Sequence, residues 1–182
     1  MQAKTNLKIG DKLPEFSLIA TNGRECNLYE FEESKIIVVM FICNHCPYVK
    51  AYEDRLIKLQ RDFASRWVTF VGINSNDDLN YPEDSFENMI LKSKEKNYNF
   101  PYLRDETQKV AKMFGATRTP EIFVFDQNRI LQYHGRIDDN WQEPEKVTKE
   151  DLKKAIEALL SGKQIDVKET TSIGCTVKWI NS

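Results

Sequence analysis

The chain has 182 residues, of which 41% are hydrophobic and 30% are charged, and its formal net charge is -2. This balance predicts one globular domain and argues against the strongly basic proteins that bind nucleic acid or anionic membrane surfaces. No apolar run approaches the roughly 20 residues of a transmembrane helix, and residues 1–6 lack the apolar stretch of a signal peptide. We therefore expect a cytoplasmic protein, or a periplasmic one if a signal segment has been removed.

The N-terminal region predicts a β-hairpin. Residues 9–18 alternate apolar and polar side chains around Pro14, which predicts an edge strand because proline cannot donate a hydrogen bond to a neighbouring strand. Asn22-Gly23 is a turn signal, so residues 26–28 would form the returning strand.

The strongest apolar run lies at residues 36–41 and is rich in β-branched side chains. Such a run predicts a central parallel strand that is buried on both faces. A helix is expected directly after it, with Pro47 tolerated near the first turn. Its apolar stripe recurs at helical spacing: Val49, Tyr52, Leu56, Leu59 and Phe63.

Further elements follow in order: a strand at 67–73, a helix at 83–96, a short strand at 101–103, a helix from Asp105 to a stop at Gly115, strands at 121–125 and 130–133, and a helix at 148–160 with Thr148 as its N-cap. This alternation predicts parallel strands, except for the two adjacent strands near the end, which must be antiparallel. We expect a single α/β domain over residues 1–182. Its mixed central sheet would be flanked by helices, with a hairpin extension (1–34) and a C-terminal tail (163–182).

The segment Cys43-Asn44-His45-Cys46 lies between the buried strand and the following helix. A helix N-terminus stabilises a thiolate, and a second cysteine one turn away can close a disulfide. The spacing therefore predicts thiol-disulfide chemistry, with Cys43 as the more exposed nucleophile and Cys46 as the resolving thiol. Either cysteine could instead be a small buried hydrophobe.

Other residues are candidates for supporting roles. His45 would lower the pKa of a neighbouring thiol, or merely cap the turn. Cys175, in the tail, is either a third redox cysteine that attacks a mixed disulfide or a buried residue that anchors the tail. Cys26 is expected to be structural. Arg136-Ile137-Asp138-Asp139 either brings a carboxylate base near the site or forms a solvated turn with a local ion pair.

The order of elements, with C-x-x-C after the first central strand and Thr119-Pro120 before the third, resembles the thioredoxin fold. The G-D-x-x-P-x-F-x-L pattern at 10–18 is similar to the peroxiredoxin-like branch, which includes alkyl hydroperoxide reductase relatives. The motifs at 41–49, 135–139 and 174–179 resemble an uncharacterised subfamily of that branch.

This resemblance implies a three-layer thioredoxin-like fold in which Pro120 is cis and faces the two sulfurs. It also implies that the backbone of Thr119 pairs with an extended substrate strand. The expected partners are a disulfide-containing protein or a small thiol, and an electron donor of the thioredoxin or glutathione type. We expect no cofactor, no metal, no nucleic acid and no membrane, and a monomer or a homodimer.

Two departures from the related families bear on activity. Typical peroxiredoxins carry P-x-x-x-T-x-x-C before the peroxidatic cysteine, which would align with Cys46, but the proline and threonine positions here are Val39 and Cys43. Their absence argues against peroxide as the substrate. Thioredoxins carry a buried aspartate where this chain has Ile37, so the resolving thiol needs another base or water.

The leading hypothesis is a thiol-disulfide oxidoreductase that uses Cys43 and Cys46. One alternative is a thiol-dependent peroxidase resolved by Cys175 or by the partner cysteine of the C-x-x-C motif. Another is a non-enzymatic module that binds a metal or a partner, because cysteine and histidine are ligand types suited to zinc. Its ligands would come from Cys43, His45, Cys46 and Cys175.

Overall fold

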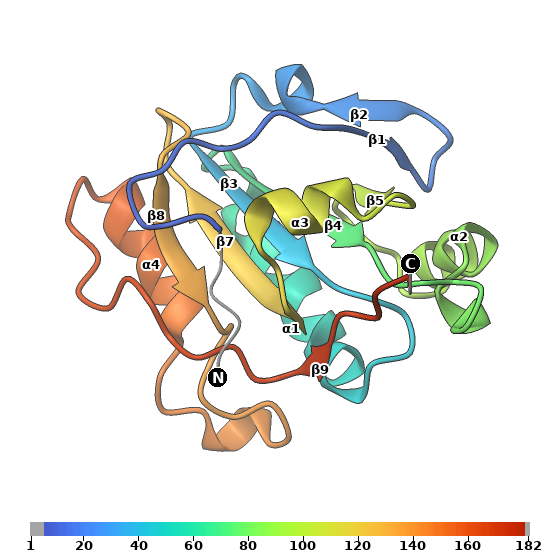
Figure 1. Ribbon diagram of the computed structural model, residues 1–182. Coiled ribbons are helices and arrows are strands. Elements are labelled where there is room, and N and C mark those ends of the chain that lie inside the picture. Colours follow the sequence, from blue (N-terminus) through green and yellow to red (C-terminus); the bar gives the residue numbers. More distant parts are fainter. Residues whose placement is uncertain (1–5, 181–182) are drawn as a thin grey trace.

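The computed structural model describes residues 6–180, and its centre is a seven-stranded mixed sheet in the order β2-β1-β5-β4-β3-β7-β8 (Figure 1). The strands are β1 (Ser17–Ala20), β2 (Glu25–Asn27), β3 (Ile36–Phe41), β4 (Val68–Asn74), β5 (Tyr102–Arg104), β7 (Glu121–Phe125) and β8 (Leu131–Gly135). Two short strands, β6 (Arg118–Thr119) and β9 (Cys175–Thr176), form a separate pair. Among the described residues, no helix is long and apolar enough to cross a membrane.

Strand β3 lies at the centre of the molecule, and all six of its residues are buried. It pairs parallel with β4 and antiparallel with β7, so the predicted central strand is confirmed, with parallel pairing on one side only. Successive side chains point to opposite faces of a strand. Val38 and Met40 therefore pack into one apolar layer, while Val39 and Phe41 pack into the other.

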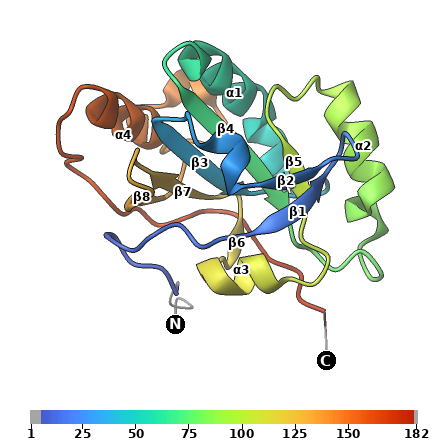
Figure 2. The same ribbon diagram turned by 90° about the horizontal axis from the view of Figure 1, so that it is seen from above.

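Helices cover both faces of the sheet, which confirms the three-layer thioredoxin-like fold (Figure 2). Helices α1 (Pro47–Ala64) and α4 (Asp151–Leu160) lie on one face, and α3 (Lys109–Phe114) lies on the other. Helix α2 (Phe86–Glu95) buries Met89 in the same layer as α1. The helical stripe read from the sequence is largely buried, because Val49, Leu56 and Phe63 all lie in this layer.

The predicted edge strand is wrong. Strand β1 begins only at Ser17 and pairs antiparallel with both β2 and β5, so β2 forms that edge of the sheet. The upstream segment that contains Pro14 pairs with the turn before β8 instead, through the Lys12–Ile130 bridge and backbone hydrogen bonds such as that from the Leu13 N–H to the Arg129 carbonyl. Alternation alone could not reveal that a strand from a later part of the chain, β5, covers the open side of the hairpin.

Three helix starts also differ from the prediction. Helix α3 begins at Lys109 instead of Asp105. Helix α4 begins at Asp151, because the N–H and hydroxyl of Thr148 bind the carboxylate of Asp139 instead of capping the helix. The predicted helix at 83–96 divides into a short 3₁₀ turn, η2 (Pro82–Asp84), and α2. The division falls at Ser85, whose hydroxyl accepts a hydrogen bond from the N–H of Asn88 and so caps α2.

Residues 168–180, which we call the C-terminal strap, run back across the sheet from the α4 side toward α2 (Figure 1). Near its start, the Thr170 N–H donates to the His134 carbonyl at 3.0 Å. Near its end, β9 pairs with β6, a strand that the sequence did not predict. Gly135, with φ at +149°, permits the close approach, since a Cβ there would lie 2.5 Å from the Thr170 carbonyl oxygen.

We predict that Gly135→Ala lowers the free energy of unfolding by about 1–3 kcal/mol, because its new methyl group must displace the strap backbone. Hydrogen exchange of the Thr170 amide should accelerate as well. Gly162→Ala is the control: its φ is also positive, but nothing lies within 4 Å of its would-be Cβ. If the Thr170 amide exchanged at the same rate in both variants, a packing role for Gly135 would be contradicted.

Candidate active site

The two cysteines of the C-x-x-C motif lie where β3 gives way to α1. Cys43 follows the end of β3 by two residues, and Cys46 is the N-cap residue of α1. Their exposed fractions are 1% and 0%. Both cysteines are therefore buried, and exposure does not single out Cys43 as the sequence led us to expect.

The loop before β7 faces both sulfurs. The Thr119–Pro120 peptide bond is cis, as the resemblance implied. The Thr119 hydroxyl lies 3.5 Å from the sulfur of Cys43, and its carbonyl oxygen lies 3.2 Å from the sulfur of Cys46, from which it accepts a hydrogen bond when Cys46 is protonated. Thr119 thus contacts both members of the pair.

The surroundings place negative charge on Cys46. A hydrogen bond from Cys43, and further ones from Cys175 and the backbone N–H of Val49, hold the pKa of the Cys46 thiol well below its usual range, although burial opposes them. The same hydrogen bond, together with burial and the charge of Asp84, raises the pKa of Cys43. These pKa directions favour Cys46, at the helix N-terminus, as the thiolate, whereas the sequence led us to expect Cys43 as the nucleophile.

Cys175 joins the pair from the other end of the chain. In the β6–β9 register it lies opposite Thr119, and its side chain packs against the apolar layer that contains Cys43 and Cys46. Burial and the interaction with Cys46 raise the pKa of Cys175. Cys26 lies elsewhere, on β2 in the apolar layer of α3, where burial raises its pKa to about 11. Three of the four cysteines thus form one cluster.

Asp84 belongs to no motif that the sequence analysis identified. It is fully buried, and its carboxylate accepts hydrogen bonds from the Asn44 N–H at 2.6 Å, the Asn76 amide at 2.8 Å and the Asn74 amide at 3.3 Å. It also contacts His45 Nδ1 at 2.5 Å. Nothing in the local sequence distinguishes Asp84 from Glu83, which lies in the same turn. Only the tertiary fold buries Asp84 behind the C-x-x-C motif.

His45 is turned toward Asp84 and stacks on Tyr81, with ring centroids 5.4 Å apart and planes within 8°. Ligand atoms of Cys43, His45 and Asp84 all lie within 4.8 Å of one another. A buried carboxylate and an imidazole are thus placed beside Cys43, where the chain lacks the aspartate of thioredoxins. The predicted effect of His45 on thiol acidity remains a prediction.

The loop at 136–139 does not supply the missing base. Asp138 accepts hydrogen bonds from the Tyr52 hydroxyl and from Arg55, both at 2.7 Å. Arg136 pairs with Asp151 at 2.8 Å. The loop borders Pro120. Asp138 is buried, and the ion pairs of the loop reach to Arg55 of α1 and Asp151 of α4, so the loop is not a solvated turn with a local ion pair.

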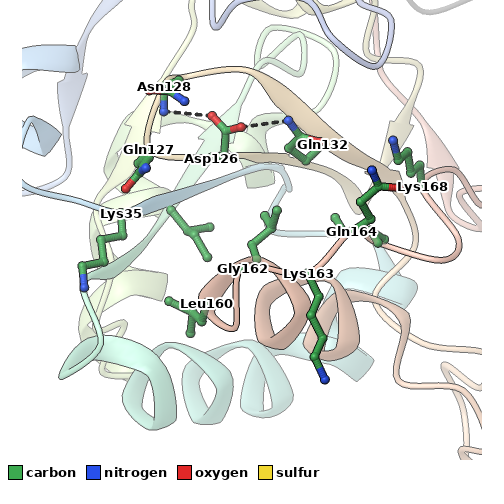
Figure 3. Close-up of a pocket in the computed structure, with 13 residues that line it drawn as sticks. Lys35, Asp126, Gln127, Asn128, Gln132, Leu160, Gly162, Lys163, Gln164 and Lys168 are labelled. Carbon is green, nitrogen blue, oxygen red and sulfur yellow. Dashed lines mark hydrogen bonds between the residues drawn. The ribbon is translucent and has the colours of Figure 1, made fainter.

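A separate hollow lies at the opposite end of β3, where Lys35 precedes the strand (Figure 3). Lys163 and Lys168 also line it, and the carboxylate of Asp126 in its wall accepts hydrogen bonds from the Asn128 N–H and the Gln132 side chain. No cysteine is among its described lining residues. The hollow is therefore distinct from the cysteine cluster.

Comparison with known proteins decides the family. The model of the AhpC/TSA family matches residues 9–134, which contain the C-x-x-C motif, the cis-proline loop and the sheet. The chain belongs to the AhpC/TSA family. Membership supports a thiol-redox function. The comparison with curated proteins found no match.

Two solved structures resemble this AhpC/TSA member over nearly its whole length, and a third shares its fold at lower identity. An uncharacterised conserved protein from Geobacillus kaustophilus is 42% identical, with 98% of this chain and 96% of that one covered and a TM-score of 0.90. A hypothetical protein from Sinorhizobium meliloti is 37% identical over the whole of both chains, with a TM-score of 0.92. The peroxidoxin BcpB from Mycobacterium tuberculosis shares the fold at 18% identity, with 85% and 95% covered and a TM-score of 0.60.

We predict that Asp84→Asn destabilises the protein by about 1–3 kcal/mol, because an amide cannot accept all the hydrogen bonds that the buried carboxylate accepts. It should also lower the pKa of Cys43, since the charge of Asp84 raises it. Urea unfolding and the pH dependence of Cys43 alkylation measure the two effects. Asp62→Asn, on the exposed surface, should change neither, and equal behaviour of the two variants would contradict a site role for Asp84.

The thiolate on Cys46 yields a pH-dependent prediction. Ultraviolet absorbance should show one thiolate that persists below the usual thiol pKa of about 8.5. Cys43→Ala removes the hydrogen bond that lowers the pKa of Cys46 most, so this step should move to higher pH. Cys43→Ser keeps a donor and should move the step less. Identical titrations of the two variants would show that the hydrogen bond is not the cause.

Proposed function

We propose that this AhpC/TSA member is a thiol-disulfide oxidoreductase in which Cys43 and Cys46 alternate between dithiol and disulfide. One observation carries the proposal: the buried sulfurs of Cys43 and Cys46 both lie within 3.5 Å of Thr119 in the cis-proline loop, and the pKa of Cys46 is lowered there. The thiolate is the nucleophile of thiol-disulfide exchange, and a helix N-terminus favours it.

In the reducing direction, the pair gives two electrons to a substrate disulfide. Cys46 attacks a sulfur of the disulfide that reaches it, and one thiolate leaves. Cys43 then loses its proton, attacks Cys46 and releases the second thiolate. Asp84, with His45 bound to it, is positioned beside Cys43 to receive that proton. This places a buried carboxylate in the role for which the sequence offered no candidate at Ile37.

The same chemistry suggests the setting of the reaction. Exchange between thiols needs no bound cofactor, only a disulfide-containing substrate and a thiol donor of the glutathione or thioredoxin type. We propose a reducing compartment such as the cytoplasm, where cysteines serve catalysis more often than structure. Western blotting of fractionated cells tests that assignment. A periplasmic location would contradict it.

Disulfide mapping by mass spectrometry across glutathione redox buffers tests the proposed function. We expect a Cys43–Cys46 disulfide that appears with one two-electron midpoint, to be compared with about -270 mV for thioredoxin. Cys43→Ser and Cys46→Ser should each abolish it, while Cys26→Ser, in the apolar layer of α3, should leave the midpoint unchanged. Absence of this disulfide at every accessible potential would refute the proposal.

A thiol peroxidase is the second candidate, favoured by the position of Cys175 next to the Cys46 thiolate. Cys46 would be oxidised to a sulfenic acid, and a neighbouring thiol would resolve it with loss of water. Val39 and Cys43 replace the proline and threonine that bind peroxide in typical members. Consumption of hydrogen peroxide with a thiol donor, lost in Cys46→Ser, would establish this activity.

A metal-binding module is supported less well. Cys43, His45 and Asp84 are close enough to share an ion. However, the Asp84 carboxylate already accepts hydrogen bonds from three asparagines, which occupy much of its capacity. A metal would have to displace them. Metal content of the purified protein, measured before and after exposure to zinc, distinguishes this alternative from the redox proposals.

A further inference from the structure

We propose that Cys175 is a shuttle cysteine, which carries the disulfide between an outside partner and the buried pair Cys43 and Cys46. This inference rests on the proposed function and adds the route by which that pair reaches its substrate. It also names the substrate class that the route admits: a small disulfide rather than an extended polypeptide.

The first observation is the order of exposure. Cys43 and Cys46 are 1% and 0% exposed, whereas Cys175 is only partly buried. Disulfide exchange requires the attacking sulfur to reach the disulfide directly. Among the three clustered cysteines, Cys175 is the one that a molecule from solvent meets first. It lies opposite Thr119, whose carbonyl oxygen is 3.2 Å from the Cys46 sulfur, and it packs against the layer that holds Cys46.

The second observation is that the strap occupies the place of a substrate strand. The resemblance implied that an extended substrate pairs with the backbone of Thr119, but β9 of the chain itself pairs there. The fit is close: a Cβ at Gly174 would lie 2.1 Å from the Thr119 carbonyl oxygen. Cys175 therefore stands where the cysteine of a bound substrate strand would stand.

The third observation is that the strap is fastened on both sides of Cys175. Upstream, Thr170 binds His134; downstream, the Val177 N–H donates to the Thr117 carbonyl at 3.0 Å. The Lys178 carbonyl accepts a hydrogen bond from the Asp77 N–H at 2.8 Å. An external strand would have to break these bonds before reaching Thr119, whereas a small disulfide can react at Cys175 with the strap in place.

The charges around Cys175 suit a small anionic disulfide. Lys178 and Arg118 both favour the thiolate of Cys175 and so act against the burial that raises its pKa. Both are cations that could also attract carboxylates of the incoming molecule. Oxidised glutathione, which is small and carries carboxylates, is therefore the probe of choice.

Oxidised glutathione oxidises the buried pair in three exchange steps. The Cys175 thiolate attacks oxidised glutathione, forms a mixed disulfide and releases one glutathione thiolate. Cys46 attacks the Cys175 sulfur, forms a Cys46–Cys175 bond and releases the second. Cys43 loses its proton and attacks Cys46, so that Cys175 leaves as a thiolate. The pair loses two electrons, one glutathione disulfide becomes two glutathione molecules, and Cys175 returns to its starting state.

Rapid quenching after mixing reduced protein with oxidised glutathione tests the shuttle, with the Cys43–Cys46 disulfide followed by mass spectrometry. We expect Cys175→Ser to slow its formation at least about tenfold, because the buried pair loses its accessible partner. Cys26→Ser should match the wild type. An equal or faster rate in Cys175→Ser would overturn the proposal and make the strap a cover only.

A trapping variant provides the second measurement. Cys43→Ser removes the last attacking thiol, so we expect a Cys46–Cys175 disulfide to accumulate. Glutathione remaining on Cys175 or Cys46 without that bond would also overturn the shuttle. The two proposals fail differently: without a Cys43–Cys46 disulfide in the wild type the oxidoreductase itself fails, whereas a normal disulfide formed at the same rate without Cys175 refutes only the shuttle.

Discussion

The coupling between the Cys43 and Cys46 thiols is the interaction on which the rest of the site depends. It raises the pKa of Cys43 and lowers that of Cys46, and each shift is supported by a different part of the fold. The helix N-terminus and the strap add donors to Cys46, while burial and Asp84 keep Cys43 a thiol. Because both sulfurs are buried, small changes in these neighbours act on the pair with little screening by water.

Asp84 is a buried carboxylate close to the C-x-x-C motif. Thioredoxins carry their aspartate on the central strand, whereas here the η2 turn brings Asp84 beside Cys43 and three asparagines hold it in place. Burying a carboxylate is costly unless it is well hydrogen-bonded. The dense set of donors around Asp84 meets that condition, and it links the C-x-x-C motif to the end of β4, where Asn74 lies.

The C-terminal strap separates this chain from a simple thioredoxin-like exchange protein. In an open site, the backbone beside the cis proline is free to pair with a substrate; here β9 occupies it and brings a cysteine with it. The strap therefore covers the backbone of Thr119, and in the proposed shuttle it also supplies the third cysteine. Both effects come from one feature, the close backbone approach that Gly174 permits.

The sequence by itself determined the elements whose signals are local: the buried strand β3, the helix α1 behind it and the C-x-x-C motif between them. The resemblance added the cis Thr119–Pro120 bond. Only the tertiary structure decided that Cys46 carries the charge, that Asp84 stands beside Cys43 and that Cys175 meets Cys46. Periodicity and spacing describe contacts within one element or turn, whereas these three depend on where the folded chain brings segments far apart in sequence.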